Sequence, residues 1–369
     1  MAGTRGYMIR AIKKKFHTGF FCTLAVLLTM CATGTAWSDG AVIDSLGRRV
    51  SITAECKRIA CLYAFTGHVV AMLGRADAIV AVSNGLKRDV LLNDMYPAIR
   101  RAVVPKYQGA INIEELATVR PDIVFVAAET GRNKAEARKL DACGITWIAV
   151  EFNSMREQQR VITLIGQAIG AEEKAESYNA YYRSCVDRVQ AGLADIAPEK
   201  RVSVYHATVE ATRTTPRNSL STDWVHALGV ENVVERDAKR MLDGASQVSL
   251  EQILLWDPDV ILANEPAVTA HIQTEPRWSA MRAVKSGRVY QMPIGISRWG
   301  HPGSLETPLA ILWAAKTIFP QRFPELGLPK ETRDFYENFF GYTVSDKKIQ
   351  EILSGRGMRL SKNRKKKQR

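Results

Sequence analysis

The sequence predicts an α/β protein with two lobes, each built around a parallel sheet, and one long helix that joins them. Short apolar runs alternate with helical segments twice along the chain, before residue 153 and again after residue 197. The stretch between them, 154–196, contains no strand candidate. Nearly the same phrase also occurs twice, as INIEELATVRPDIVFVAAE at 111–129 and VSLEQILLWDPDVILANEP at 248–266. Two copies of one helix–strand unit are expected when two similar lobes share a chain.

The first lobe is predicted to span residues 41–152. Its strand candidates are uninterrupted apolar runs, and each is followed by a segment with helical composition. Uninterrupted apolar strands between helices are typical of a parallel sheet that is covered on both faces. The expected strands are 58–64, 79–83, 122–127 and 145–151, and the expected helices are 66–74, 112–119 and 133–144.

The linking segment, 153–197, reads as two helices with a break near IGAEE. The second, from about residue 171 to residue 194, would be about 36 Å long at 1.5 Å per residue, enough to pass from one lobe to the next. Strand and helix signals then alternate again through a second lobe, 198–358. Its expected strands are 201–207, 259–263 and 288–293, and its expected helices are 221–229, 277–287, 304–319 and 331–341.

The chain of 369 residues has a formal charge of +13, but the excess is confined to its ends. Residues 1–38 hold five basic residues and residues 359–369 hold seven, with no acid in either segment. Removing these 12 from the 51 basic residues leaves 39, against 38 acidic residues. Because the body is nearly neutral, we expect no nucleic-acid partner and read the tail 359–369 as a disordered basic end.

The N-terminus predicts export to the periplasm. Basic residues precede the apolar run GFFCTLAVLLTMCATGTA, and small residues follow it, which is the order of a cleavable signal peptide at 1–38. Met8 is an alternative start to Met1. A lipid on Cys31 is disfavoured because Met30 stands where a small residue is expected. Four cysteines remain after cleavage; Cys56 and Cys61 could pair, but the apolar surroundings of Cys61 favour a free thiol.

Each copy of the repeated phrase predicts a capped helix that leads into a buried strand. Asn112 and Ser249 are N-cap residues, and Glu115 and Gln252, three positions later, complete a capping box in both copies. Glu114 and Glu251 are not needed for the capping box. A carboxylate in the first helical turn is also stabilised by the helix dipole, so this pair has a structural explanation as well as a functional one.

The order and spacing of these segments resemble the class III periplasmic substrate-binding proteins of ABC importers, the group that serves cobalamin, ferric siderophores and haem. The resemblance runs through RIACLYAFTGHVVAMLG, YQGAINIEELATVRPDIVF, the long helix, NSLSTDWVHALGVENVV, VSLEQILLWDPDVILA and RVYQMP. It implies two Rossmann-like lobes joined by a rigid spine helix, with a ligand held in the cleft between them. It also implies a monomer without an intrinsic cofactor, in which Glu114 and Glu251 dock on the permease dimer of the inner membrane.

Ligands of parallel α/β sheets bind beyond the carboxyl ends of the strands, so the loops after the strands are where cargo residues are expected. These loops combine aromatic rings with a few cations, which suits a flat or chelated anion that stacks and accepts bidentate hydrogen bonds. The predicted ligand-binding residues are Tyr63, Phe65, Asn84, Tyr107, Gln108, Glu129, His206, Arg213, Arg298, Trp299 and His301.

Structural explanations compete at several of these positions. Phe65 could pack inward against the first helix, Trp299 could cap the second sheet, and Arg213 and Arg298 could form surface ion pairs. His206 could be a satisfied buried histidine, and His301 could replace an N-cap. If both imidazoles reached the ligand, haem or a bare metal would become credible.

The sequence thus predicts a binding protein that captures a ferric siderophore or a similar iron chelate. Haem, cobalamin, a free metal ion or an oxyanion such as molybdate are alternatives on the same fold. An exported α/β hydrolase that uses His206 or His301 as its base is a rival of another class. We expect no enzyme, because the sequence lacks G-x-S-x-G, G-x-x-x-x-G-K, H-E-x-x-H and a G-x-G-x-x-G after a strand.

Overall fold

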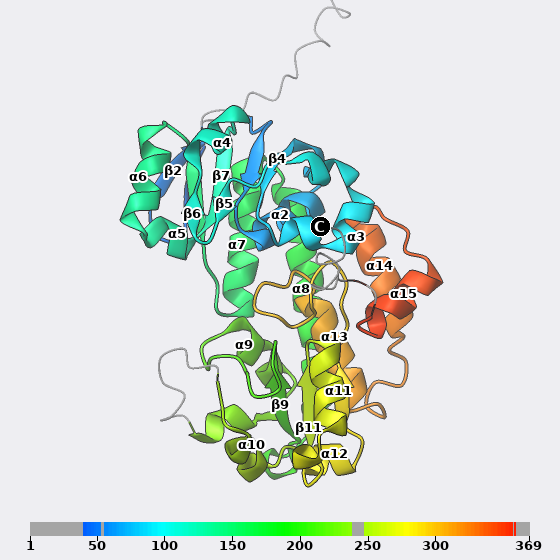
Figure 1. Ribbon diagram of the computed structural model, residues 1–369. Coiled ribbons are helices and arrows are strands. Elements are labelled where there is room, and N and C mark those ends of the chain that lie inside the picture. Colours follow the sequence, from blue (N-terminus) through cyan, green and yellow to red (C-terminus); the bar gives the residue numbers. More distant parts are fainter. Residues whose placement is uncertain (1–39, 53–54, 238–246, 357, 359–369) are drawn as a thin grey trace, which may run out of the picture. The chain divides into compact units, whose positions relative to one another are not determined.

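The computed structural model describes residues 40–52, 55–237, 247–356 and 358 (Figure 1). The predicted signal segment 1–38, with Cys31 and both start methionines, and the basic tail 359–369 lie outside the described residues. None of the described helices is both long and apolar enough to cross a membrane.

The first lobe contains a four-stranded parallel sheet in the order β4-β3-β7-β8. The strands are almost entirely buried, as their uninterrupted apolar sequences predicted. The strands are β3 (Ile59–Cys61), β4 (Ile79–Val82), β7 (Ile123–Ala127) and β8 (Trp147–Val150), and the helices are α2 (Ala64–Met72), α3 (Val90–Met95), α4 (Ile113–Thr118), α5 (Ala128–Arg132) and α6 (Lys134–Ala142). The first lobe also contains two antiparallel hairpins that the sequence analysis did not predict. They are β1–β2 (Gly40–Ile43 and Arg49–Ile52) and β5–β6 (Lys106–Tyr107 and Ala110–Ile111).

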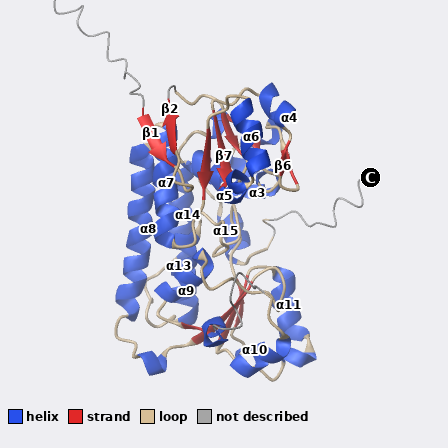
Figure 2. Ribbon diagram, turned by 90° about the vertical axis from the view of Figure 1, so that its left-hand side faces the viewer, coloured by secondary structure: helices blue, strands red, loops and turns tan. Residues whose placement is uncertain are grey.

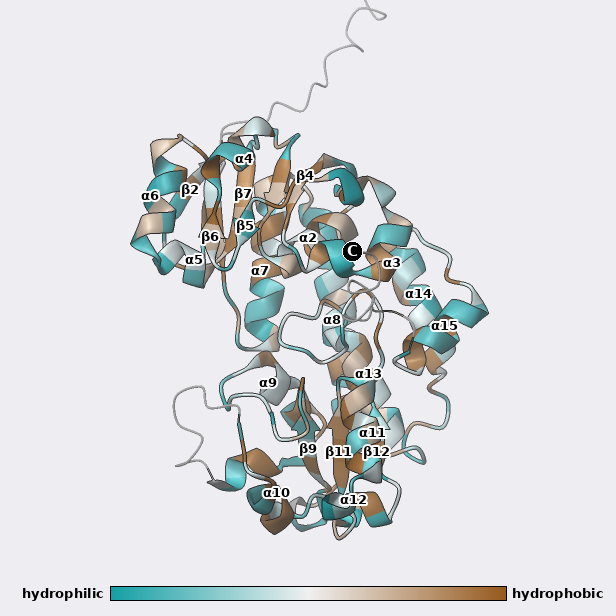
Figure 3. Ribbon diagram, in the orientation of Figure 1, coloured by the Kyte–Doolittle hydropathy of each residue, from teal (hydrophilic) through white to brown (hydrophobic). Residues whose placement is uncertain are grey.

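The second lobe has a parallel sheet in the order β10-β9-β11-β12. Figure 3 shows its central strand β11, like β7 of the first sheet, coloured as hydrophobic. The strands are β9 (Ser203–Ala207), β10 (Glu231–Asn232), β11 (Val260–Ala263) and β12 (Val289–Gln291). The helices are α9 (Leu220–Ala227), α10 (Leu250–Trp256), α11 (Pro266–Thr274), α12 (Arg282–Lys285), α13 (Thr307–Ile318), α14 (Leu328–Phe340) and α15 (Asp346–Leu353).

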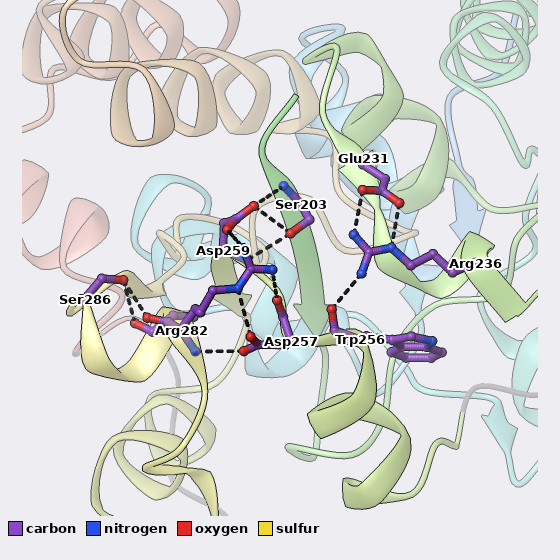
Figure 4. Close-up of polar contacts among 9 residues, drawn as sticks. Ser203, Glu231, Arg236, Trp256, Asp257, Asp259, Arg282 and Ser286 are labelled. Atoms are coloured by element: carbon purple, nitrogen blue, oxygen red, sulfur yellow. Dashed lines mark hydrogen bonds and ion pairs between the residues drawn. The ribbon is translucent and has the colours of Figure 1, made fainter. Parts of the chain in front are cut away.

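The helix predicted at 277–287 is wrong in extent. The chain instead forms a short 3₁₀ turn, Pro276–Trp278, and then the four-residue helix α12. Asp257 explains the late start of α12, because its carboxylate accepts a hydrogen bond from the Arg282 backbone N–H at 2.8 Å. Figure 4 shows Arg282 also bonded to the carboxylate of Asp259.

Two helices join the lobes, α7 (Met155–Ile169) and α8 (Glu172–Leu193), which lie side by side in Figure 2. They separate at Gly170, which ends α7 in the left-handed conformation with φ +67°. The break predicted near IGAEE and the long second helix are therefore confirmed. One buried apolar cluster includes Phe125 of the first sheet, Tyr178 of α8 and Trp313 of α13, so the same core continues through both lobes. The predicted fold class, two α/β lobes with parallel sheets and a spine helix, is confirmed.

In each copy of the repeated phrase, the aspartate after the proline bonds the chain where the first parallel strand of its lobe begins. Asp122 accepts hydrogen bonds from the backbone N–H groups of Lys57 and Arg58, both at 2.7 Å. Asp259, at the equivalent place in the second copy, accepts from the backbone N–H of Ser203 at 2.9 Å and from its hydroxyl (Figure 4). The Pro-Asp that follows each helix therefore anchors the first parallel strand of its lobe.

Candidate functional site

Tyr63 and Phe65 follow β3, at the edge of the first sheet where cargo residues were expected. Tyr63 is half-buried, and burial raises the pKa of its hydroxyl to about 12, so the hydroxyl stays protonated at neutral pH. The ring of Phe65 is fully buried and packs on Phe152, with centroids 4.5 Å apart. Phe65 also lies 6.2 Å from the Tyr63 ring, so it supports Tyr63 from inside the lobe.

The loop after β4 lies against the start of α2. A methyl group at Gly85 would lie 3.2 Å from the Cβ of Ala64 and 3.6 Å from the hydroxyl of Ser83. That hydroxyl is buried and has no hydrogen-bond partner among the described residues. Asn84, the predicted residue of this loop, is exposed. Ser83 belongs to the same loop after a strand, where cargo residues were expected, but the sequence did not distinguish its buried hydroxyl from the exposed Asn84.

Tyr107, Gln108 and Glu129 belong to the β5–β6 turn and to α5. Gln108 has a positive φ of 47°, and the Tyr107 side chain is 67% exposed. Lys106 donates a hydrogen bond to the Thr130 hydroxyl at 2.5 Å, which holds the turn next to α5 and to the exposed Glu129. These residues therefore form a protruding group that is tied to α5.

His206 and Trp299 are buried in the second lobe. His206 Nε2 lies 2.8 Å from Asn264 Oδ1, and the Asn264 amide donates to the Trp299 carbonyl at 2.8 Å. Burial lowers the pKa of His206 to about 4, so the imidazole is neutral at pH 7. The Trp299 ring is fully buried and offers no face for stacking in this structure.

The two predicted arginines lie in different surroundings. Arg298 is half-buried and forms an ion pair with Glu265, with 2.6 Å between Nη1 and Oε1. Arg213 is exposed, and its backbone bridges to Gln247. Arg298 is therefore held beside the loop after β11, whereas Arg213 lies at the surface.

Tyr63 and His301 are the two predicted residues that the structure brings together across the lobes. His301 Nδ1 accepts a hydrogen bond from the Gly303 N–H at 3.2 Å. A methyl group added at Gly303 would lie 3.8 Å from this nitrogen and 3.5 Å from the Tyr63 hydroxyl. Because Nδ1 accepts, the proton of the neutral ring is assigned to Nε2, which can then donate. The loop after β3 and the loop before α13 thus meet, and both carry hydrogen-bond donors.

The described residues contain no cluster of three or more His, Cys, Asp or Glu side chains that could hold a metal ion. His206 instead faces Asn264, and His301 accepts from Gly303. Cys61, Cys143 and Cys185 are free thiols, and only Cys143 of these is exposed; Cys56 is buried.

Glu114 and Glu251 are exposed in the first turns of α4 and α10. The predicted caps precede them, since the Asn112 side chain accepts from the Glu115 N–H at 3.1 Å and the Ser249 hydroxyl accepts from the Gln252 N–H at 3.2 Å. The backbone of its helix turn and the Ser249 hydroxyl lower the pKa of Glu251. Leu255, one turn further along α10, is 79% exposed.

A pocket of about 390 Å³ lies where β8 meets α7, away from the predicted cargo residues. Three carboxylates line it, and each already has a cation nearby: Asp44 pairs with Arg48, Glu151 with Arg132 and Glu157 with Arg160. The pocket therefore presents carboxylates that are already paired with cations.

Comparisons with known proteins agree with this architecture. The sequence profile of the family described as "Periplasmic binding protein" matches residues 59–294. The chain is 26% identical over 335 residues to the molybdate-binding protein MolA of Haemophilus influenzae, covering 83% of this chain and 92% of that protein. It is 24% identical over 255 residues to the Fe(3+)-citrate-binding protein YfmC of Bacillus subtilis, covering 68% and 78%.

Among solved structures, a periplasmic solute binding protein from Veillonella parvula is similar with a TM-score of 0.72. The two chains share 26% identity, and the match covers 85% of this chain and 96% of that one.

Proposed function

The chain belongs to the family of periplasmic binding proteins, and we propose that it captures a small anionic cargo and delivers it to the permease of an ABC importer. The meeting of Tyr63 with the His301–Gly303 turn carries this proposal, because it brings donors from both lobes to one place. We propose that the segment 1–38 directs export to the periplasm.

We propose a compact oxyanion, such as molybdate, as the first candidate cargo. The rings of Phe65 and Trp299 are fully buried, which removes two of the stacking surfaces that a flat chelate would use. What remains around Tyr63 are small donors, its own hydroxyl and the imidazole of His301, and the adjacent loop after β4 adds the Ser83 hydroxyl. Arg298, half-buried and paired with Glu265, places a guanidinium on the loop that carries His301. The long match to a molybdate-binding relative supports the same candidate.

An iron chelate is the second candidate. The protruding Tyr107 ring, 67% exposed, could stack on a larger ligand, and the iron-citrate-binding relative supports this possibility. Because the two cargoes would use different tyrosines, single substitutions can separate them.

Calorimetric titration of the exported protein with molybdate and with ferric citrate tests both candidates. For an oxyanion, Tyr63→Phe should weaken binding about 10- to 100-fold, since a hydrogen bond to a charged group contributes about 1.5–3 kcal/mol. Tyr107→Phe is the matched control and should bind molybdate like the parent. Tight binding of ferric citrate with no response to molybdate would reject the oxyanion, and binding of neither would reject both candidates.

The rival hydrolase reading has its own test. The purified protein should not turn over chromogenic esters or phosphates. Turnover that disappears in His301→Ala would contradict a transport role and would assign the imidazole as a catalytic base.

A further inference from the structure

Glu306 is a fully buried carboxylate at the N-terminus of α13 that the sequence analysis did not single out. One oxygen accepts a hydrogen bond from the Ile296 N–H at 2.9 Å. The other accepts from the Ser297 N–H at 2.8 Å and from the Ser297 hydroxyl at 2.9 Å. The Tyr336 hydroxyl of α14 is a further partner of the first oxygen. Both carboxylate oxygens are thus used, mostly by one segment of the chain.

These partners are all neutral, and no ion pair to Glu306 occurs among the described residues. Burying a carboxylate without a cation is unfavourable unless hydrogen bonds replace its water. Burial accordingly raises the pKa of Glu306, and the hydrogen bonds partly oppose this shift. We infer that this unfavourable burial serves to hold another part of the chain in place. The hydrogen-bond partners of Glu306 show which segment that is.

The segment is the loop 294–304, which we call the cargo loop because it carries Arg298 and His301. Other buried side chains hold its carbonyl groups: Asn264 bonds the Trp299 oxygen, Trp224 and Ser221 bond the Gly300 oxygen, and Gln158 bonds the Ser304 oxygen. Glu306 instead accepts from consecutive backbone N–H groups at residues 296 and 297, immediately before Arg298. It therefore fixes the N-terminal half of the loop.

Gly295 shows that this contact leaves no spare room. A methyl group at that position would lie 2.0 Å from Glu306 Oε1 and 2.0 Å from the Tyr336 hydroxyl. Real Cβ atoms do not approach so closely, so the backbone of the cargo loop lies directly on the carboxylate. Glycine at 295 and glutamate at 306 depend on each other.

We propose that Glu306 is a positioning residue for cargo binding, which sets the backbone of the cargo loop so that Arg298 and His301 face the ligand. This inference rests on the proposed function, since it assigns Glu306 a role at the same site. Preorganised groups bind a ligand without the ordering cost that a mobile loop would add.

Glu306→Gln tests the inference. The variant replaces one acceptor oxygen with an NH₂ group, so either the Ile296 or the Ser297 N–H loses its partner. We expect hydrogen exchange at the amide that loses its partner to accelerate at least tenfold without cargo. We expect the Kd for molybdate, or for ferric citrate if that is the cargo bound, to rise at least tenfold. Tyr336→Phe removes one donor to Glu306, so it should raise amide exchange and the cargo Kd less than Glu306→Gln does. Gly295→Ala disturbs the same contact from the loop side and should raise both strongly.

Two controls separate positioning from general destabilisation. Glu337→Gln changes an exposed carboxylate on α14 and should alter neither readout. Gly166→Ala lowers stability at a distant helix contact and should leave the Kd unchanged. Should Glu306→Gln fail to fold, Tyr336→Phe and Gly295→Ala provide the test.

The possible failures are distinguishable. Wild-type protein that binds neither ligand would overturn the proposed function and this inference with it. The second failure concerns this inference alone. It is overturned if the wild-type protein binds cargo but Tyr336→Phe, Gly295→Ala and, where it folds, Glu306→Gln keep the wild-type amide exchange or the wild-type Kd.

Discussion

At the scale of single residues, the second lobe uses buried polar side chains to shape its loops. His206 is 2% exposed, and its Nε2 lies next to Asn264, which in turn bonds the Trp299 carbonyl. Burial is the main cause of its lowered pKa, and the nearby positive charge of Arg298 adds to it, whereas the Asn264 contact opposes it. A histidine kept neutral in this way is a structural donor whose protonation is disfavoured in the folded state.

His206 should make stability fall in acid. The unfolded chain takes up this proton near pH 6.5, but the folded protein does not until about pH 4, so between these values the unfolded state binds more protons. The free energy of unfolding should therefore decrease as pH falls from 6.5 to 4, by about 3 kcal/mol from this group. In His206→Gln, urea unfolding curves should show a shallower loss over that window.

The exposed His271 supplies the control, since His271→Gln should follow the wild-type pH profile. Identical pH slopes for wild type and His206→Gln would show that the imidazole is not buried in its neutral form.

At the scale of elements, the sequence predicted the features that depend on residues close together in the chain. It predicted the helix caps at Asn112 and Ser249 and the buried strands, because each cap bonds a residue three positions away and each strand is one uninterrupted apolar run. The two-residue strand β10, Glu231–Asn232, is too short and polar to give such a signal. The burial of Phe65 and Trp299 and the role proposed for Glu306 depend on contacts between distant segments, which periodicity does not reveal.

The contact between α7 and α8 depends on a glycine within α7. Alanine normally stabilises a helix interior by about 1 kcal/mol relative to glycine. At Gly166, however, the new methyl group would lie 2.7 Å from the Cβ of Ala175 and 3.2 Å from the carbonyl oxygen of Ala171. Neither neighbour can rotate away, and overpacking of this kind costs about 1–3 kcal/mol. We therefore expect Gly166→Ala to lower the free energy of unfolding by about 1 kcal/mol, measured by urea denaturation.

Gln167→Ala, on the exposed side of the same helix, is the matched control and should change stability little. A Gly166→Ala variant more stable than wild type would show that α7 and α8 can move apart at no cost.

At the scale of the whole molecule, the C-terminal helices return to the first lobe. Figure 1 shows α14 and α15 beside α3 of the first lobe. The Tyr96 hydroxyl donates to the Phe340 carbonyl at the end of α14, at 3.0 Å, and Lys348 Nζ of α15 lies 3.5 Å from Asp94 Oδ2. The lobes are thus connected in sequence by α7 and α8 and in space by α14 and α15 as well. The family's transport role implies one further contact, with a partner outside the chain.

We propose that this contact uses Glu114 and Glu251, one from each lobe. Both side chains are exposed in the first turn of a helix, and each belongs to a copy of the same repeated phrase. Exposed carboxylates add little to the stability of the chain itself, so they are available to bind basic residues of a permease.

The double variant Glu114→Ala, Glu251→Ala should therefore keep the cargo Kd within about twofold of wild type. It should lose at least about 90% of permease-dependent uptake, because truncating partners of charged interface pairs typically costs about 2–5 kcal/mol. Glu172→Ala with Glu173→Ala removes two exposed first-turn acids from α8 and should leave uptake intact. If the Glu114, Glu251 variant transports like wild type while binding cargo normally, the permease grips another surface.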